Sequence, residues 1–346
     1  MASGGIERLC AAADEERPLR IALVEELRRL VPFSSYVWAV TDPATEVAIA
    51  PLADVPGEAM AALPRLIRLR YLTTVNRWTS LRAAAESLHR ATGGVLDRSL
   101  LHREVLTDIG VGDIATVIFR DQHGLWGWLD LWREATDAPF SDRELERLSA
   151  VAPPITTALR RCLALTFGQT AAVPERPGPI VLVLSPTLDV IAQTPHTDGY
   201  LRALLPPDGD RRPIPAGAYN VAAQLLAVEA GVDDHPPTSR VRLRDGIWLT
   251  FRAARVQSDR PTADQEIAVS IEPCSPAERL DLFARTNALT PRETELLDLL
   301  MAGADTTAIA EGLYVSQHTV QDHLKSIFAK TGARTRRVLV GRVAGR

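Results

Sequence analysis

The feature that most constrains this chain is a series of short helices, each with its own start signal, near the C-terminus. Thr290 is followed by Pro291 and by Glu293, a pattern that predicts a helix N-terminus with a capping box. Asp305 supplies a second N-cap signal and Ser316 a third. Three starts at such close spacing predict three consecutive helices that are joined by short turns.

The third of these helices has a narrow apolar seam and a polar face. Val320, Leu324 and Ile327 recur at intervals of four and three residues, which predicts packing against the two preceding helices. The opposite side carries amide, carboxylate and ammonium groups, and such a face suits the major groove of DNA, where base edges present donors and acceptors. The residues predicted to contact DNA are Ser316, Gln317, His318, Thr319, Gln321, Asp322, Lys325, Lys330, Arg334 and Arg336.

The distribution of charge agrees with a DNA-facing C-terminus. The formal net charge of the whole chain is −4. Residues 285–346 contain nine Lys or Arg and six Asp or Glu, whereas residues 1–284 contain 30 and 37. The basic surplus therefore lies in the predicted helical module, behind a larger acidic body. The side chains expected at phosphate oxygens are Ser316, Thr319, Lys330, Arg334, Arg336 and Arg337.

This C-terminal stretch resembles the LuxR-type, or GerE-like, helix-turn-helix family. The resemblance rests on LTPRE at the first helix, IAEGLYVS through the turn, TVQDHL in the recognition helix and KTGARTR after it. The family implies a four-helix module that binds double-stranded promoter DNA as a homodimer. It also implies a fourth helix, here about 334–343, that serves dimerisation through Val338, Leu339 and Val343. Gln321 stands where the family usually has Lys or Arg, which implies fewer phosphate contacts and a shallower salt dependence.

Two proline-rich stretches divide the rest of the chain. AAVPERPGP, at 171–179, predicts a linker, and PCSP, at 273–276, predicts a second break just before the basic segment. The expected parts are a first domain at 1–168, a linker at 169–178, a second domain at 179–275 and a DNA-binding domain at 276–346.

The first domain is expected to be α+β, and its order of elements resembles a GAF-type sensory domain. Apolar runs on either side of TDPAT predict one hairpin, and Ile114–Phe119 with Leu125–Trp132 predict another. A capping box at Ser141 predicts a long helix that runs to about Leu165. Helical periodicity also predicts helices near 57–70, 79–91 and 97–109.

The second domain is also expected to be α+β, and it resembles a PAS-like fold. IVLVLSPTLDVIAQT predicts two short strands around a turn, and 266–271 predicts a last strand. Between them, RVRLRDGIWLTFRAARV predicts a hairpin, because Asp245-Gly246 is a favoured two-residue turn between alternating strands. The predicted fold class is therefore two α+β domains followed by an all-α helix-turn-helix domain.

A tryptophan-rich strand, LWGWLDLW, is the candidate ligand site. Strict alternation places Trp126, Trp128, Asp130 and Trp132 on one face of the strand, and Trp38 is a further candidate for the same cavity. Three indoles around a carboxylate can line a cavity for an aromatic or cationic ligand. The alternative is that this face is covered by the long helix that follows, or forms a dimer contact.

Other classes of function lack support in the sequence. No apolar run reaches the roughly 18 residues of a membrane span, and three widely separated cysteines indicate reduced thiols in a cytoplasmic protein. No catalytic constellation, phosphate loop or metal cluster is present, so we expect neither an enzyme nor a cofactor. Two hypotheses stay open for the first two domains: they sense an unidentified small molecule or shape a dimer, or they bind only protein partners.

Overall fold

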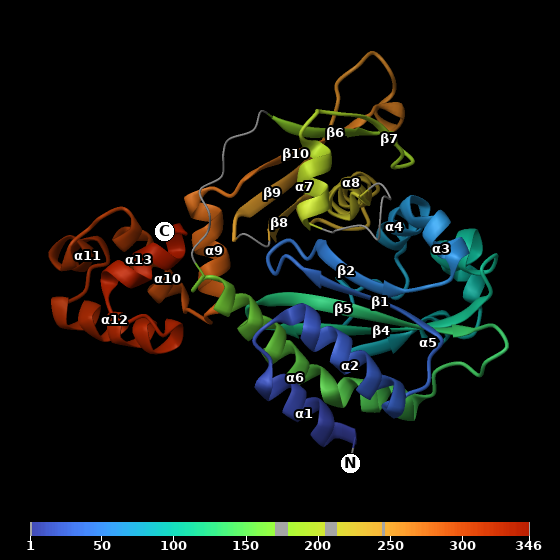
Figure 1. Ribbon diagram of the computed structural model, residues 1–346, viewed down its shortest axis with the longest axis horizontal. Helices are drawn as coiled ribbons and strands as arrows, with labels where there is room; N and C mark the ends of the chain where they lie inside the picture. Colours follow the sequence, from blue (N-terminus) through green and yellow to red (C-terminus); the bar gives the residue numbers. More distant parts are fainter. Residues whose placement is uncertain (1, 170–178, 205–212, 244–245, 346) are drawn as a thin grey trace.

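The computed structural model describes residues 2–169, 179–204, 213–243 and 246–345 (Figure 1). These residues form two α+β parts, each with one five-stranded antiparallel sheet, and a helical C-terminal part. The predicted fold class is confirmed, whereas the exact domain boundaries stay a prediction. Apart from Gln169, the predicted linker lies outside the described residues, as does Asp245 of the predicted hairpin turn.

The first sheet has the strand order β2-β1-β5-β4-β3. Both predicted hairpins are present, as β1 with β2 and β4 with β5. The strands are β1 (Ser35–Thr41), β2 (Ala48–Asp54), β3 (Ala85–Ser87), β4 (Val111–Asp121) and β5 (Gly124–Glu134). One face of the sheet is covered by three helices (Figure 1): α1 (Ala2–Ala12), α2 (Glu16–Leu30) and α6 (Asp142–Thr166). The Ser141 capping box starts α6 as predicted.

The segment between β2 and β4 departs from the predicted helices. The helix expected at 57–70 is present as α3 (Gly57–Ala61) and α4 (Leu63–Leu72). The prediction of a helix at 79–91 is wrong. This stretch contains the edge strand β3, and the short α5 (Leu88–Thr92) follows it. Pairing of β3 with β4 supplies backbone hydrogen bonds that local helical periodicity cannot anticipate. The stretch 97–109 contains a 3-10 turn and one π-helical turn, His102–Leu106.

The second sheet has the strand order β7-β6-β10-β9-β8, which repeats the relative order of the first sheet. The predicted last strand and the two strands of the long hairpin are present. The strands are β6 (Ile180–Leu184), β7 (Val190–Gln193), β8 (Thr238–Arg242), β9 (Trp248–Arg255) and β10 (Ile267–Pro273). The helices α7 (Thr197–Leu204) and α8 (Ala216–Glu229) accompany this sheet, and α8 packs on β9.

The C-terminal part is a helical bundle with its own core. Its helices are α9 (Pro276–Thr286), α10 (Pro291–Met301), α11 (Thr306–Gly312), α12 (Gln317–Thr331) and α13 (Arg336–Ala344). The N-cap signals at Thr290, Asp305 and Ser316 all cap helices as predicted, because each side chain accepts a hydrogen bond from a backbone N–H in its own first turn. Within the described residues, no helix combines the length and apolar character needed to cross a membrane.

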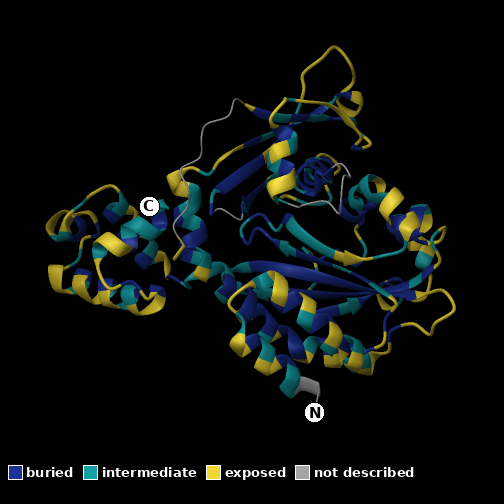
Figure 2. Ribbon diagram, in the orientation of Figure 1, coloured by how far each residue is buried: buried dark blue, intermediate teal, exposed yellow. Residues whose placement is uncertain are grey.

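The two α+β parts are packed together through a continuous apolar core. Helix α8 of the second part lies against α4 and β2 of the first. Trp78 and Trp128 from the first part belong to the same buried cluster as Leu226 and Phe251 from the second. Figure 2 shows dark blue, buried residues in both sheets and in α8 between them. The sheet face that carries Trp128 is therefore an internal surface of the chain.

A buried arginine joins all three parts. Arg240 of β8 donates from Nε and Nη2 to the two carboxylate oxygens of Asp42, at the β1–β2 turn, at 2.7 Å each. Its Nη1 donates to the carboxylate of Asp281 in α9 at 2.7 Å. A further link runs from Arg285 of α9 to the backbone oxygen of His123 in the first part, at 3.0 Å. Helix α9, the first helix of the C-terminal part, is thus hydrogen-bonded to both α+β parts.

Candidate nucleic-acid interface

Helix α12 has the two sides that the sequence predicts: one is buried and the other is exposed. Val320, Leu324 and Ile327 are buried in the core of the helical bundle. The Oγ atom of Ser316 accepts from the backbone N–H of Thr319 at 3.1 Å, which caps the helix. The seam and the cap together fix the rotation of α12, so the same residues always face outward.

The outward face of α12 carries the predicted polar side chains, and all of them are exposed. They are Gln317, His318, Gln321, Asp322 and Lys325. The carboxylate of Asp322 accepts from Lys325 Nζ at 3.2 Å and lies 3.5 Å from His318 Nε2. Such exposed pairs are worth little in water. The ammonium group of Lys325 can therefore exchange its carboxylate partner for a phosphate or a base edge at small cost.

Two of the residues predicted to contact DNA form hydrogen bonds within the helical bundle. Lys330 Nζ donates to the Glu293 carboxylate at 2.6 Å and to the backbone oxygen of Ala288 at 3.1 Å. Arg336 donates to the hydroxyl of Thr306 at 2.6 Å. Lys330 and Arg334 are both exposed residues, whereas Arg336 is partly buried.

Glu293 explains why the ammonium group of Lys330 lies against the helical bundle. Its carboxylate is buried, accepts from the backbone N–H of Thr290 at 2.7 Å and accepts from Ser326 Oγ at 2.6 Å. Burial alone would raise the pKa of this carboxyl, but the hydrogen bonds from Lys330, Ser326 and Thr290 outweigh it and lower the pKa to about 2. The residue that caps α10 therefore also holds α12 in place. A capping box indicates the first role in the sequence, and nothing local indicates the second.

The dimerisation face expected on the fourth helix is largely unavailable. Leu339 and Val343 of α13 are fully buried in the core of the bundle. Helix α9 packs on α13, and Arg279 donates to the backbone oxygens of Arg342 and Val343 at 3.2 and 2.8 Å. Of the three predicted contact residues, Val338 alone is exposed, because α9 covers the face that the family pattern assigns to a partner.

The predicted ligand residues of β5 do not share one face. Phe119 pairs with Gly127 and Arg120 pairs with Leu125, so Trp126 is an extra residue in a β-bulge. The bulge turns Trp126 to the side of the sheet that α6 covers, where its indole donates to Asp121 at 2.9 Å. Strict alternation is therefore wrong at this position. The other three predicted residues of the strand, Trp128, Asp130 and Trp132, lie on the opposite face.

Trp38, like Trp126, lies on the face of the first sheet that the helices cover. It is fully buried in the cluster that packs on α2 and α6, and its ring stacks on Phe119 with centroids 5.3 Å apart. For these two indoles the alternative interpretation, a sheet face covered by helices, is the correct one.

The remaining indole-carboxylate pair already contains a cation from the chain itself. Arg70 of α4 forms a two-point ion pair with Asp130, at 2.9 and 3.1 Å. Its guanidinium carbon lies 5.0 Å from the ring centroid of Trp78 and 5.4 Å from that of Trp128, and these two rings stack at 5.1 Å. Thr116 adds a hydrogen bond to Asp130 at 2.6 Å. The cation next to Trp128 and Asp130 is therefore Arg70 of the chain itself.

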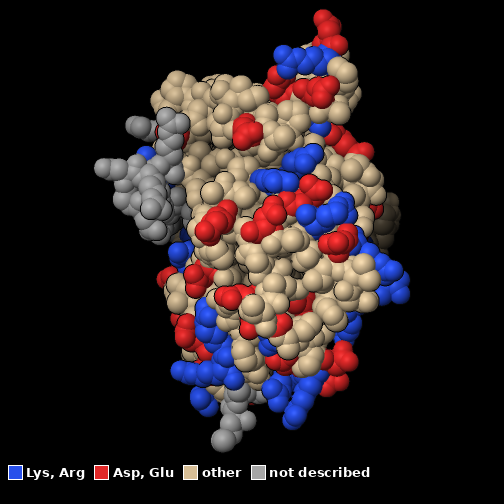
Figure 3. Space-filling view, turned by 90° about the vertical axis from the view of Figure 1, so that its right-hand side faces the viewer, with Lys and Arg blue, Asp and Glu red and all other residues tan. Residues whose placement is uncertain are grey.

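Charge elsewhere on the first part is mixed. Figure 3 shows acidic and basic side chains interspersed over the side of the molecule that faces away from α12. A face of mixed sign does not attract the DNA backbone as a single-signed patch does. The α12 face is therefore the best candidate for contact with nucleic acid.

Fold and site together define a class: a DNA-binding transcription regulator whose helix-turn-helix module follows two α+β domains. Residues 287–343 match the family model of bacterial regulatory proteins, luxR family. The C-terminal part of the chain is thus a LuxR-type DNA-binding module, and two α+β domains precede it.

Comparison with whole proteins finds solved structures that share little sequence with the chain. No curated protein matches the chain in sequence. The structure of Escherichia coli SdiA is 12% identical, with 97% of this chain and 92% of that chain covered and a TM-score of 0.34. Vibrio cholerae VqmA is 17% identical, with 49% and 83% covered and a TM-score of 0.20. The bacteriophytochrome RpBphP3 from R. palustris is 12% identical, with 78% and 61% covered and a TM-score of 0.31.

Proposed function

We propose that this chain regulates transcription in the cytoplasm by binding specific double-stranded DNA sites as a homodimer through α12. The observation that carries the proposal is the exposed polar face of a helix whose other side is fully buried. Gln317, Gln321 and Asp322 offer amide and carboxylate groups for base edges. Lys325 serves either a phosphate or a guanine, and the hydroxyls of Ser316 and Thr319 lie at the positive end of the helix, where phosphate binds well.

Arg334 is the basic residue after the helix that we assign to the DNA backbone. Lys330 and Arg336 keep their internal partners in this proposal, and they orient the module rather than neutralise phosphates. His318 completes the base-reading face. A small number of free cations predicts a shallow dependence of affinity on salt.

We also propose that the two α+β domains set the distance between the two DNA-binding modules of the dimer. The support is the attachment of α9 to both domains through Arg240 and Arg285. In addition, Phe167 at the end of α6 stacks on Trp248 of β9 at 5.4 Å and meets Phe283 of α9 at 5.3 Å. A movement of either domain would therefore displace α9 and, with it, the spacing of the recognition helices.

A second candidate keeps the DNA-binding module but gives the α+β domains only protein partners. The observation that favours it is Arg70, which fills the aromatic face of the first sheet where a ligand was expected. On this hypothesis Trp128 and Asp130 stabilise the fold and bind nothing from solution.

The test is fluorescence anisotropy with a labelled fragment of the gene's own promoter. We expect Lys325→Ala to weaken binding and to lower the slope of log K against log salt by about one, since one phosphate contact is lost. Arg147→Ala, at an exposed site on α6, removes a cation far from α12 and should change neither quantity. Wild-type binding should saturate at two chains per duplex. Wild-type affinity and slope in Lys325→Ala would show that α12 does not contact the DNA.

A further inference from the structure

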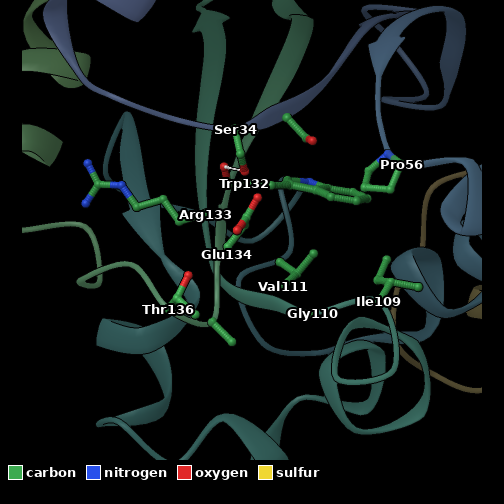
Figure 4. A pocket seen from close by; sticks show the side chains of 11 residues that line it. Ser34, Pro56, Ile109, Gly110, Val111, Trp132, Arg133, Glu134 and Thr136 are labelled. Atoms are coloured by element: carbon green, nitrogen blue, oxygen red, sulfur yellow. Dashed lines mark hydrogen bonds between the residues drawn. The ribbon is translucent and has the colours of Figure 1, made fainter.

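A hollow of about 320 Å³ lies at the end of the first sheet, where β5 finishes and β4 begins (Figure 4). The indole of Trp132 forms one wall, and Pro56, Ile109 and Val111 add apolar surface. Figure 4 shows the side chain of Glu134 bordering the same hollow beside the indole. The volume is at the lower end of the range for small-molecule sites, so it suits a compact ligand.

The charge of this hollow is negative. Glu134 is exposed, and within the described residues its carboxylate has no ion-pair partner. The neighbouring Arg133 points away from the hollow (Figure 4) and donates to the carboxylate of Glu144 at 2.6 Å, so its charge is already balanced. A ligand that enters the hollow therefore meets one unpaired carboxylate next to an indole.

The strand repeats one recognition pattern twice. Trp128 and Asp130 stand two residues apart on one face, and the guanidinium of Arg70 binds both. Trp132 and Glu134 follow with the same spacing and both line the hollow. In the part of the chain that the structure describes, no Lys or Arg lies over the Trp132 ring or pairs with Glu134. The first pair holds a cation of the chain itself. In the second pair Trp132 is buried, with 5% of its surface exposed at the wall of the hollow, and Glu134 is exposed.

We propose that the Trp132–Glu134 hollow binds a small organic ammonium ion from solution. The indole attracts the cation through its ring face, and Glu134 balances the charge. The apolar walls accommodate the methyl or methylene groups of the ion. Binding of the ion does not depend on the proposed regulator function. Its role as the effector of the first domain does rest on that function.

The test uses the full chain with 5-fluorotryptophan in place of its six tryptophans. Fluorine NMR separates the six indoles, and Trp132→Phe assigns the resonance of Trp132. Choline is the probe, and 3,3-dimethylbutan-1-ol is its neutral isostere. We expect choline to shift the Trp132 resonance saturably, with the isostere at least about tenfold weaker because it lacks the cation.

Glu134→Gln removes the charge at an exposed position and should weaken choline binding by about two- to fivefold while the spectrum of the other indoles stays unchanged. Glu146→Gln, at an exposed site on α6, is the matched control and should bind as the wild type does. An unmoved Trp132 resonance, or equal binding of choline and its isostere, would overturn the proposal. Promoter binding in the same samples keeps the two hypotheses apart: intact DNA binding without choline binding refutes the cation site alone, and the reverse refutes the regulator function alone.

Discussion

Replacement of Arg240 by methionine tests how much the buried Arg240–Asp42 ion pair contributes to the stability of the three joined parts. The carboxylate of Asp42 is fully buried and accepts from the Arg240 guanidinium twice, from the Arg240 backbone N–H at 2.9 Å and from the Ala44 N–H at 3.0 Å. Arg240→Met removes the guanidinium but keeps both backbone donors and most of the side-chain volume. Asp42 is then a buried charge without a counter-ion.

The cost follows from that burial. Removing one partner of a buried ion pair destabilises a protein by about 3–5 kcal/mol, since the other charge is left desolvated and unpaired. The matched control is Arg252→Met on the neighbouring strand β9, whose side chain is 44% exposed and whose pairs with Glu272 and Glu278 lie at the surface. Loss of these exposed pairs should cost only about 0–1 kcal/mol.

The pH dependence gives a sharper test than the loss of stability alone. Burial by itself would raise the pKa of Asp42, but the hydrogen bonds and charge of Arg240 lower it below its usual range. In the wild type this pair stabilises the fold above the unfolded pKa, and the stabilisation is lost as the pH falls through the folded value. In Arg240→Met burial dominates, so the pKa of Asp42 rises and acidification relieves the buried charge.

The assay is urea unfolding of the full chain at about pH 7 and about pH 5, monitored by tryptophan fluorescence. We expect the difference in unfolding free energy between wild type and Arg240→Met to shrink at the lower pH. Adding Asp42→Asn should restore part of the stability, since it removes the unpaired charge. A difference that is small, or that is the same at both pH values, would refute the reasoning.

Two further predictions concern the helical bundle. Val320→Asp should unfold the bundle, because a carboxylate would replace two fully buried methyl groups in its core. Far-ultraviolet circular dichroism should show the loss of helix. The control Gln321→Asp, at the next residue on the exposed face, should stay folded. Glu293→Gln should cost about 1–3 kcal/mol at neutral pH, because Lys330 loses its carboxylate partner. As the pKa of Glu293 is about 2, its stabilisation is lost as the pH falls toward that value, so urea unfolding should show the variant and the wild type converging in acid.

The helix-turn-helix could be predicted almost residue by residue, because its signals are local. Thr290, Asp305 and Ser316 cap their helices through hydrogen bonds that span three residues. The seam of Val320 and Leu324 follows from helical periodicity alone. The long helix after Ser141 was predicted for the same reason.

The role of a charged residue was harder to predict than its position. Lys330 and Arg336 stand where phosphate contacts were expected, yet both bond to groups far away in the chain, Glu293 and Thr306. Leu339 and Val343 were expected at a dimer contact and are covered by α9. The partner that a side chain contacts depends on how the helices pack. The sequence of a single helix does not determine that packing.

The candidate ligand site shows the same limit in a strand. The spacing of Trp128, Asp130 and Trp132 follows from alternation, and their common face was predicted correctly. A single bulge moved Trp126 to the other face, and Arg70, 60 residues earlier in the chain, filled the space next to Asp130.

The sequence by itself determined the DNA-binding module, its caps and its exposed recognition face, because these depend on contacts within a few residues and on one helical period. Only the tertiary structure decided which cations are free, which indoles meet a cavity and how Arg240 fastens α9 to both sheets. Those outcomes depend on residues brought together from distant parts of the chain. Burial then makes each pairing strong, because a desolvated charge must find its partner inside the fold.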